Sequence, residues 1–191
     1  MNLAIVDLEC TSLRSDQGFL LCAGIKPLGG KPTVIGLHQW LPQSRKFDPL
    51  AIDAGLVVTV RDEMQKFDGW ITWNGLMFDL PWLDDRLMLN GQNQLERRFA
   101  RGLDMMWHAR MGKSALSSSR LDSVARNLNL KVQKTALDLG VWKRAEAEAR
   151  ALFKCGRDNY DYILEHNLKD LEVTEAVYEH LKPRVVTISK R

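Results

Sequence analysis

Three short apolar segments near the amino terminus, joined by brief polar connections, constrain the fold of this chain more than any other feature. They span residues 3–9, 19–26 and 32–40 and are rich in Val, Ile, Leu and Phe. Ser, Asp and Gly separate the first two segments, and Gly-Gly-Lys-Pro separates the second from the third. These residue types favour turns, so the three segments are typical of short strands. We therefore expect an antiparallel meander.

The pattern changes to alternating strands and helices after the meander. Asp48-Pro49 resembles an N-cap followed by proline at the first helical position, which predicts a helix running to about Phe67. The further predicted elements are a strand at 70–73, a helix from 79 to about 90, a brief strand near 103, and helices ending near 112, at 122–129, at 142–153 and at 158–181. A meander followed by such alternation predicts an α/β fold with one mixed five-stranded sheet, an antiparallel meander plus parallel strands, flanked by helices.

Length and composition limit the class of protein. A chain of 191 residues with 45% hydrophobic residues fits one domain, which we expect at 1–182, followed by a short C-terminal tail at 183–191. No apolar run approaches the roughly 18 residues of a membrane span, and no basic region precedes an apolar stretch as in a secretory signal. The 3 cysteines lack C-x-x-C spacing, which argues against a disulfide framework or a cysteine zinc site. We therefore expect a cytoplasmic protein without membrane partners.

Charge is distributed unevenly along the chain. Residues 1–96 carry 8 basic and 12 acidic side chains, residues 97–157 carry 14 and 5, and residues 158–191 carry 5 and 7. Each single cation could belong to a solvated helix face. The excess of 9 positive charges in the middle segment nevertheless favours a polyanionic partner.

Two carboxylates share one face of the first predicted strand. Side chains alternate along a strand, so Asp7 and Glu9 emerge together at its end. At a separation of about 4 Å their repulsion would be about 4 kcal/mol at an effective dielectric near 20. A divalent cation such as Mg²⁺ would convert this repulsion into ligation. The alternative is a strand that becomes polar as it leaves the core.

Two later segments add further candidate residues. Asp79 follows the fourth predicted strand at a loop-to-helix junction, where it could instead be only an N-cap. His166 and Asp170 stand four residues apart in the last predicted helix and so share a face. Taken alone, that pair would be read as a surface contact.

Together these segments resemble the DEDD superfamily of 3′-to-5′ exonucleases, which has a ribonuclease-H-like fold. Asp7-Leu8-Glu9 matches the D-x-E motif, and Thr11 lies in the run that follows it. The second motif, N-x-x-x-F-D-x-P-x-L, is similar to that of the proofreading domains of family-B DNA polymerases and their stand-alone relatives. It is matched by Asn74, Phe78, Asp79, Pro81 and Leu83.

The third motif departs from the family pattern. Tyrosine-type members have their aromatic residue four positions before the last Asp, and histidine-type members have a histidine five positions before it. Here His166 occupies the four-residue position before Asp170. We predict His166 as the water-orienting or general-base residue because imidazole titrates near neutrality. Tyr162, one turn earlier on a similar face, is the alternative.

The resemblance implies a two-metal mechanism on a nucleic acid. Asp7, Glu9, Asp79 and Asp170 would hold two divalent ions, Mg²⁺ or Mn²⁺. Thr11 and Phe78 would contact the terminal nucleotide of the substrate, and Asn74 would either shape the loop or contact the substrate. One ion would activate the attacking water and the other would stabilise the leaving oxygen. The implied activity is hydrolysis from the free 3′ end of single-stranded nucleic acid, with DNA favoured over RNA, and replication or repair proteins are possible partners.

Two other functions remain open at this stage. The chain could be a non-catalytic nucleic-acid-binding or partner-binding domain on the same fold, or a structure-selective endonuclease. Asp104 and Asp122 are predicted to cap helices, and Trp107 and Trp142 are the tryptophans we would test for base stacking. Nothing in the sequence indicates the oligomeric state.

Overall fold

The strands form one mixed sheet in the order β3-β2-β1-β4-β5. The computed structural model describes residues 1–41, 47–96, 102–110, 118–135 and 138–184. The antiparallel meander consists of β1 (Leu3–Cys10), β2 (Leu20–Pro27) and β3 (Thr33–Gly36). On the other side of β1 lie the parallel strands β4 (Gly69–Thr72) and β5 (Leu103–Asp104). The predicted mixed five-stranded α/β sheet is confirmed.

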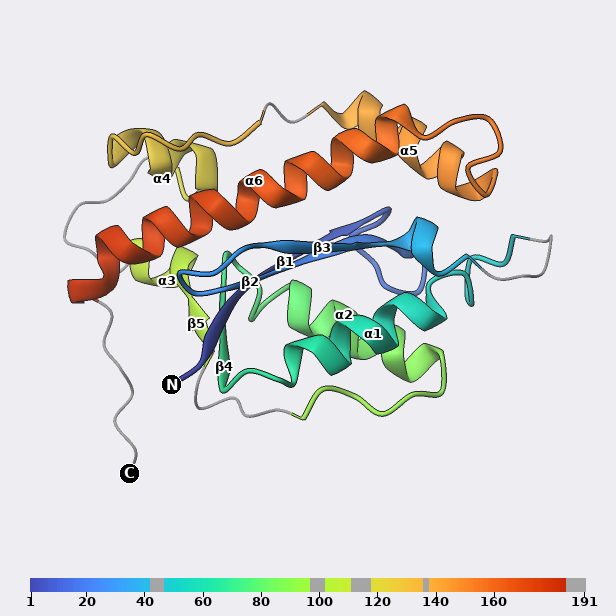
Figure 1. The fold of residues 1–191 in the computed structure, drawn as a ribbon, viewed down its shortest axis with the longest axis horizontal. Coiled ribbons are helices and arrows are strands. Elements are labelled where there is room, and N and C mark those ends of the chain that lie inside the picture. The colour runs from blue at the N-terminus through green and yellow to red at the C-terminus, as the bar shows by residue number, and fades with distance from the viewer. Residues whose placement is uncertain (42–46, 97–101, 111–117, 136–137, 185–191) are drawn as a thin grey trace.

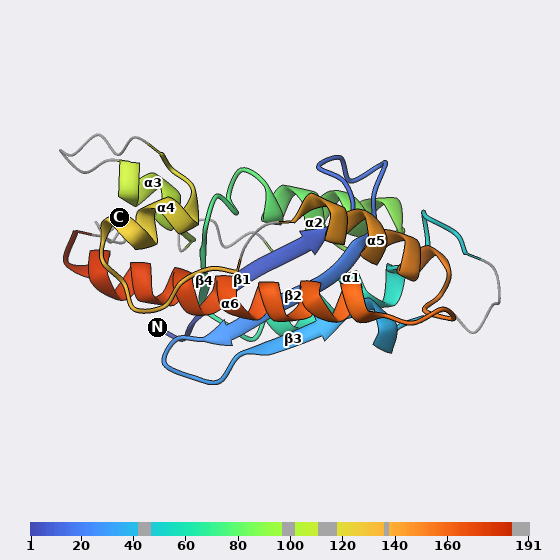
Figure 2. The same cartoon turned by 90° about the horizontal axis from the view of Figure 1, so that it is seen from above.

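Helices cover both faces of this sheet. They are α1 (Ala54–Met64), α2 (Asp79–Leu89), α3 (Met105–Arg110), α4 (Leu121–Asn127), α5 (Leu139–Arg150) and α6 (Asp158–Leu181), with 3-10 turns at Leu37–Gln39 and Lys182–Arg184. Figure 1 shows α6 crossing one face while α1 and α2 lie against the other. Figure 2, seen from above, shows α6 lying over the sheet along its length. Within the described ranges, no helix combines the length and the apolar character needed to cross a membrane.

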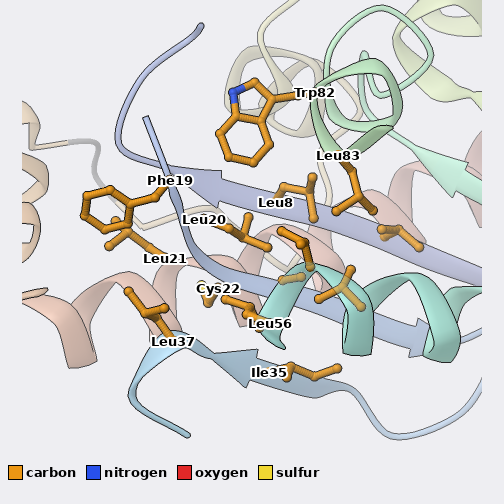
Figure 3. Packing of buried hydrophobic residues seen from close by; sticks show 14 of the residues in the cluster. Leu8, Phe19, Leu20, Leu21, Cys22, Ile35, Leu37, Leu56, Trp82 and Leu83 are labelled. Atoms are coloured by element: carbon orange, nitrogen blue, oxygen red, sulfur yellow. The ribbon is translucent and has the colours of Figure 1, made fainter. Parts of the chain in front are cut away.

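Alternate side chains of β1 pack against the helices on opposite faces of the sheet. Ala4, Val6 and Leu8 are buried in the cluster that includes the apolar residues of α1 and α2. Figure 3 shows part of this cluster, with Leu8 close to residues of β2, α1 and α2. Ile5 points to the other face and belongs to the cluster that includes residues of α6. Asp7 continues the Ile5 face, so the sheet presents its carboxylate toward α6.

The first helix begins later than predicted. α1 starts at Ala54, not next to Asp48, and ends at Met64. Asp48 is used in a preceding turn, where its side chain accepts a hydrogen bond from the Leu50 N–H and its carbonyl accepts one from the Ile52 N–H. A short acidic side chain such as that of Asp48 can accept a hydrogen bond either as a helix N-cap or within a turn, and here it does so within a turn.

The third strand is shorter than predicted, and the fifth helix begins and ends earlier than predicted. β3 ends at Gly36, and Leu37–Gln39 forms a 3-10 turn whose His38 N–H donates to the buried Tyr160 hydroxyl. α5 ends at Arg150 because Leu152 and Phe153 adopt left-handed backbone conformations, with φ of 53° and 56°. α6 spans residues 158–181 as predicted. The predicted tail falls mainly at 185–191, outside the described residues.

Candidate active site

A cavity of about 520 Å³ opens at the carboxyl end of β1, the central strand of the sheet. Asp7 and Glu9 both line it, as their shared face predicts. The full lining consists of Asp7, Leu8, Glu9, Trp73, Asn74, Phe78, Asp79, Met106, Ser119, Arg120, Leu121, Asp122, Lys134, Trp142, His166 and Asp170. Residues from the start, middle and end of the chain therefore meet at one place.

Helix α6 contributes the opposing side of this cavity. His166 and Asp170 are both buried and lie one turn apart, with His166 Nε2 at 3.8 Å from Asp170 Oδ2. The spacing of four residues places them on one face of the helix, which is the face toward β1. The structure thus brings the third predicted motif to the first.

A tight loop after β4 positions the second motif. Asn74 adopts a left-handed conformation with φ of 66°, a region that Asn tolerates better than most residues. The carboxylate of Asp104 accepts hydrogen bonds from the Asn74 N–H at 3.0 Å and the Leu76 N–H at 3.3 Å. It also accepts one from the Met106 N–H, so Asp104 caps α3 as predicted and anchors this loop as well.

Asp79, the first residue of α2, turns back toward β1. Its Oδ1 accepts a hydrogen bond from the Leu8 N–H at 3.0 Å. Leu8 lies between Asp7 and Glu9 in the strand, so this bond joins the second motif directly to the first. Asp79 is therefore more than an N-cap, because its carboxylate is committed to another element.

Burial raises the pKa of all four carboxylates. Burial, and next the charge of Glu9, raises the pKa of Asp7 well above its usual range. Burial, and next the charge of Asp170, does the same for Glu9. Burial also raises the pKa of Asp79 to about 7, although the Leu8 hydrogen bond opposes it. Burial thus disfavours the charged form of these acids, and a divalent cation would favour it.

Lys134 supplies one positive charge to the cluster and was not singled out as a site residue from the sequence. Its ammonium forms an ion pair with Asp170 Oδ2. Burial alone would lower the pKa of Lys134, but Asp170 and the other carboxylates raise it. In turn Lys134 opposes the effect of burial, which raises the pKa of Asp170. The only sequence signal for this residue is its place in the basic middle segment.

His166 is held by three neighbours. The Thr135 hydroxyl contacts its Nδ1, the Trp142 ring meets it edge-on with centroids 5.0 Å apart, and the Tyr162 ring stacks on it at 6.3 Å. Burial, and next the charge of Lys134, lowers the pKa of His166 to about 4. The imidazole is therefore neutral at physiological pH and able to accept a proton. Tyr162, the alternative, contacts the ring from outside the cavity lining.

The donor set fits a divalent cation. Glu9, His166 and Asp170 each offer a ligand atom, and these atoms lie within 4.8 Å of one another. Asp170 Oδ1 is buried and, among the described residues, has no hydrogen-bond partner. A buried carboxylate oxygen without a partner is costly, and ligation of a cation would satisfy it.

The three predicted substrate residues lie in different surroundings. Asn74 and Phe78 line the cavity beside Asp79. Thr11 is not part of the lining. Its hydroxyl accepts a hydrogen bond from the Phe19 N–H at 3.0 Å, within the connection from β1 to β2.

Among the described residues, two cations of the basic segment line the cavity. Arg120 and Lys134 line it, and Arg120 pairs with Asp122, which also pairs with Arg126. Asp122 lies in the first turn of α4 and acts there as an ion-pair partner. The N-cap of α4 is Arg120, and it makes no side-chain capping bond. The predicted capping role of Asp122 is therefore wrong. Four other cations of the segment lie outside the described residues: Arg97, Arg98, Arg101 and Lys113.

The two tryptophans of the basic segment differ in position. Trp142 lines the cavity and contacts His166. Trp107 on α3 is 62% exposed and is not part of the lining.

Part of a solved structure has a similar fold. The chain is similar to a family B DNA polymerase from the hyperthermophilic archaeon Pyrobaculum calidifontis, with a TM-score of 0.63 and 16% sequence identity. The match covers 96% of this chain and 25% of the polymerase, so the chain corresponds in length to a quarter of that protein. No curated protein matches the sequence.

A family model describes nearly the whole sequence. The model of the RNase_H superfamily matches residues 4–182, which include α1 to α6 and all five strands except Leu3 at the start of β1. The matched range includes every acidic residue of the cavity. Since the match extends far beyond half of the chain, this protein belongs to the RNase H superfamily.

Proposed function

We propose that this protein is a metal-dependent 3′-to-5′ exonuclease that hydrolyses phosphodiester bonds of single-stranded nucleic acid. The observation that carries the proposal is the meeting of Asp7, Glu9, Asp79 and Asp170 in one cavity, with burial raising the pKa of each carboxyl. A purely binding domain has no use for such a cluster, because it would repel phosphate. Catalysis by two divalent ions gives these acids a common purpose.

The four carboxylates would hold two Mg²⁺ or Mn²⁺ ions. When bound, the ions supply Lewis acidity that activates the attacking water and neutralises charge on the leaving 3′ oxygen. Asp79 and Asp7 come from rigid elements joined through the Leu8 hydrogen bond. Such support keeps ligand atoms in place without reorganisation during the reaction.

Other residues of the cavity have separate tasks in the proposal. Neutral His166, oriented by the Thr135 hydroxyl, accepts a proton from the attacking water. Lys134 places a positive charge beside the acids, where it offsets the negative charge of the phosphate. Asn74 and Phe78 would contact the terminal nucleotide from the cavity wall. Thr11 would contact the substrate from the neighbouring β1–β2 connection.

DNA is the favoured substrate over RNA. The similar solved structure is that of a DNA polymerase, and this supports a role with replication or repair proteins. Arg120 at the cavity would attract the phosphate backbone.

A cleavage assay on 5′-labelled single-stranded DNA tests the proposal. With Mg²⁺ or Mn²⁺ we expect a ladder of products shortened one nucleotide at a time, and the same assay with labelled RNA measures the preference for sugar. A single internal cut would indicate an endonuclease instead. A shift in gel mobility without cleavage in either metal would indicate a binding domain and contradict the proposal.

A further inference from the structure

Asn167 lies in α6 next to His166, yet it contacts β1 and is not part of the cavity lining. Its side chain is fully buried, at 0% exposure. Nδ2 donates to Asp7 Oδ2 at 2.8 Å and to the Asp7 backbone carbonyl at 3.2 Å. Because one amide group binds both the carboxylate and the backbone of Asp7, it fixes the orientation of that carboxylate relative to the strand.

A glycine in β2 makes this contact possible. Gly24 is the cross-strand partner of Asp7 in the β1–β2 pair. A Cβ atom at Gly24 would lie 2.2 Å from Asn167 Oδ1 and 2.6 Å from Leu171 Cδ1. Both distances are far below van der Waals contact, so any side chain there would displace Asn167 or the helix. Close approach of α6 to the sheet at this point therefore depends on glycine.

The chemistry of asparagine suits its position among acids. Its amide donates hydrogen bonds without adding negative charge, whereas an aspartate would add a third acceptor-only group beside Asp7 and Glu9. Asn167 Oδ1 is buried and, over the described part of the chain, has no hydrogen-bond partner. The residue thus remains in an unfavourable environment. The contacts that compensate for it are the two hydrogen bonds to Asp7 and a side-chain hydrogen bond to Glu9.

We propose that Asn167, seated against Gly24, is a positioning residue that holds Asp7 for metal ligation. This rests on the proposed function only in that Asp7 is taken as a metal ligand. The hydrogen bond uses Oδ2 of Asp7 and leaves Oδ1 for another partner. Partners that orient a metal ligand in this way typically affect metal affinity or activity by about 10- to 100-fold.

Binding of Mn²⁺ to the protein without nucleic acid tests the proposal. We expect Asn167→Leu and Asn167→Ala to bind Mn²⁺ about 10- to 100-fold more weakly than wild type, as measured by the electron paramagnetic resonance signal of free Mn²⁺. At saturating Mn²⁺, the KM for an oligonucleotide should remain unchanged because Asn167 does not line the cavity.

Thr174→Val is the matched control, since Thr174 is another buried polar residue of α6 and lies outside the cavity lining. It should keep the wild-type Mn²⁺ affinity. A folded Asn167 variant with Mn²⁺ affinity within twofold of wild type would overturn the proposal, as would an equal loss in Thr174→Val.

A second measurement does not depend on metal or activity. The side-chain amide protons of Asn167, identified as the NMR signals lost in Asn167→Leu, should exchange slowly with solvent in wild type and faster in Asp7→Ala. Gly24→Ala should shift the same signals. If the wild type degrades no nucleic acid and binds no Mn²⁺, the proposed function fails while slow exchange still supports the Asn167–Asp7 contact. Fast exchange in wild type would overturn the contact itself.

Discussion

Asp79 and Leu8 are joined by a hydrogen bond of 3.0 Å from the Leu8 N–H to Asp79 Oδ1, although 71 positions separate them in the sequence. The bond links the first residue of α2 to the strand that carries Asp7 and Glu9. The bond lowers the pKa of Asp79, but burial outweighs it and raises that pKa to about 7. A group of this kind makes folding stability depend on pH.

The first prediction concerns stability without metal. The folded pKa of Asp79, about 7, exceeds its ordinary value of 3.8, so between these values the folded state binds more protons than the unfolded state. Stability must then fall as pH rises from about 4 to about 7, by up to about 1.4 kcal/mol per pH unit for one group. Asp7, Glu9 and Asp170 contribute with the same sign, because the pKa of each is also raised.

Urea unfolding in chelator at pH 5, 6 and 7 measures this dependence. Asp79→Asn keeps an acceptor for the Leu8 N–H but does not ionise, so it should flatten the fall in the free energy of unfolding. Asp62→Asn, on the exposed surface of α1, should follow wild type. An Asp79→Asn protein as sensitive to pH as wild type would contradict the raised pKa.

The second prediction concerns metal. Excess chelator should abolish cleavage, and Asp7→Ala should reduce its rate by several orders of magnitude while the fold is kept. Mn²⁺ should raise the melting temperature of wild type, because it relieves carboxylate repulsion and binds only the folded state. This rise should disappear in Asp7→Ala. Cleavage at the wild-type rate in excess chelator, or in Asp7→Ala, would show that the acids do not act through metal.

The third prediction concerns Lys134, which forms an ion pair with Asp170. Lys134→Met should lower kcat by roughly 10² because a preorganised charge is lost from a buried site. It should also raise the pKa of Asp170 further, so that stability at pH 7 in chelator falls below that of wild type. Lys131→Met, an exposed neighbour in the same segment, is the control for both assays. Equal effects of the two substitutions would remove Lys134 from the mechanism.

Local patterns predicted the sheet and the acidic residues, because both depend on periodicity within single elements. The alternation in β1 is enough to put Asp7 and Glu9 on one face, and helical spacing does the same for His166 and Asp170. The family resemblance identified the three motifs as one set. Of the predicted catalytic, metal-binding and substrate residues, all except Thr11 line the cavity.

Contacts between distant segments could not be predicted in this way. Lys134 lies in an irregular stretch between α4 and α5, where no periodicity shows which side chain turns inward. The same holds for Asp53, which pairs with the fully buried Arg86 and accepts the Leu20 N–H. These buried contacts of Asp53 hold the residue just before α1 in place. The local sequence at Asp48, by contrast, was compatible with a helix cap and with a turn equally well. The difference lies in tertiary burial, which a linear pattern does not contain.

The last prediction concerns His166, where the sequence departs from the exonucleases that its motifs resemble. Loss of a general base should lower the rate, so His166→Ala should lose roughly 10² to 10⁴ in kcat. Since burial lowers the pKa of His166 to about 4, the acid limb of kcat/KM that His166 causes should lie toward that value and not near 6.5, the ordinary value. His166→Tyr should restore part of the rate, because the tyrosine-type exonucleases that the motifs resemble use the same four-residue spacing.

Thr135→Val separates orientation of the His166 ring from proton transfer, because it removes the hydroxyl at Nδ1 and leaves Nε2 in place. We expect a smaller loss of kcat than in His166→Ala, with the acid limb of the pH profile retained. In His166→Ala that limb should disappear or move, since the titrating imidazole is gone. If His166→Ala keeps both the wild-type rate and the wild-type pH profile, the imidazole is structural and packs against Trp142 without taking the proton. Tyr162→Phe would then be the next variant to assay, because Tyr162 stacks on the same ring.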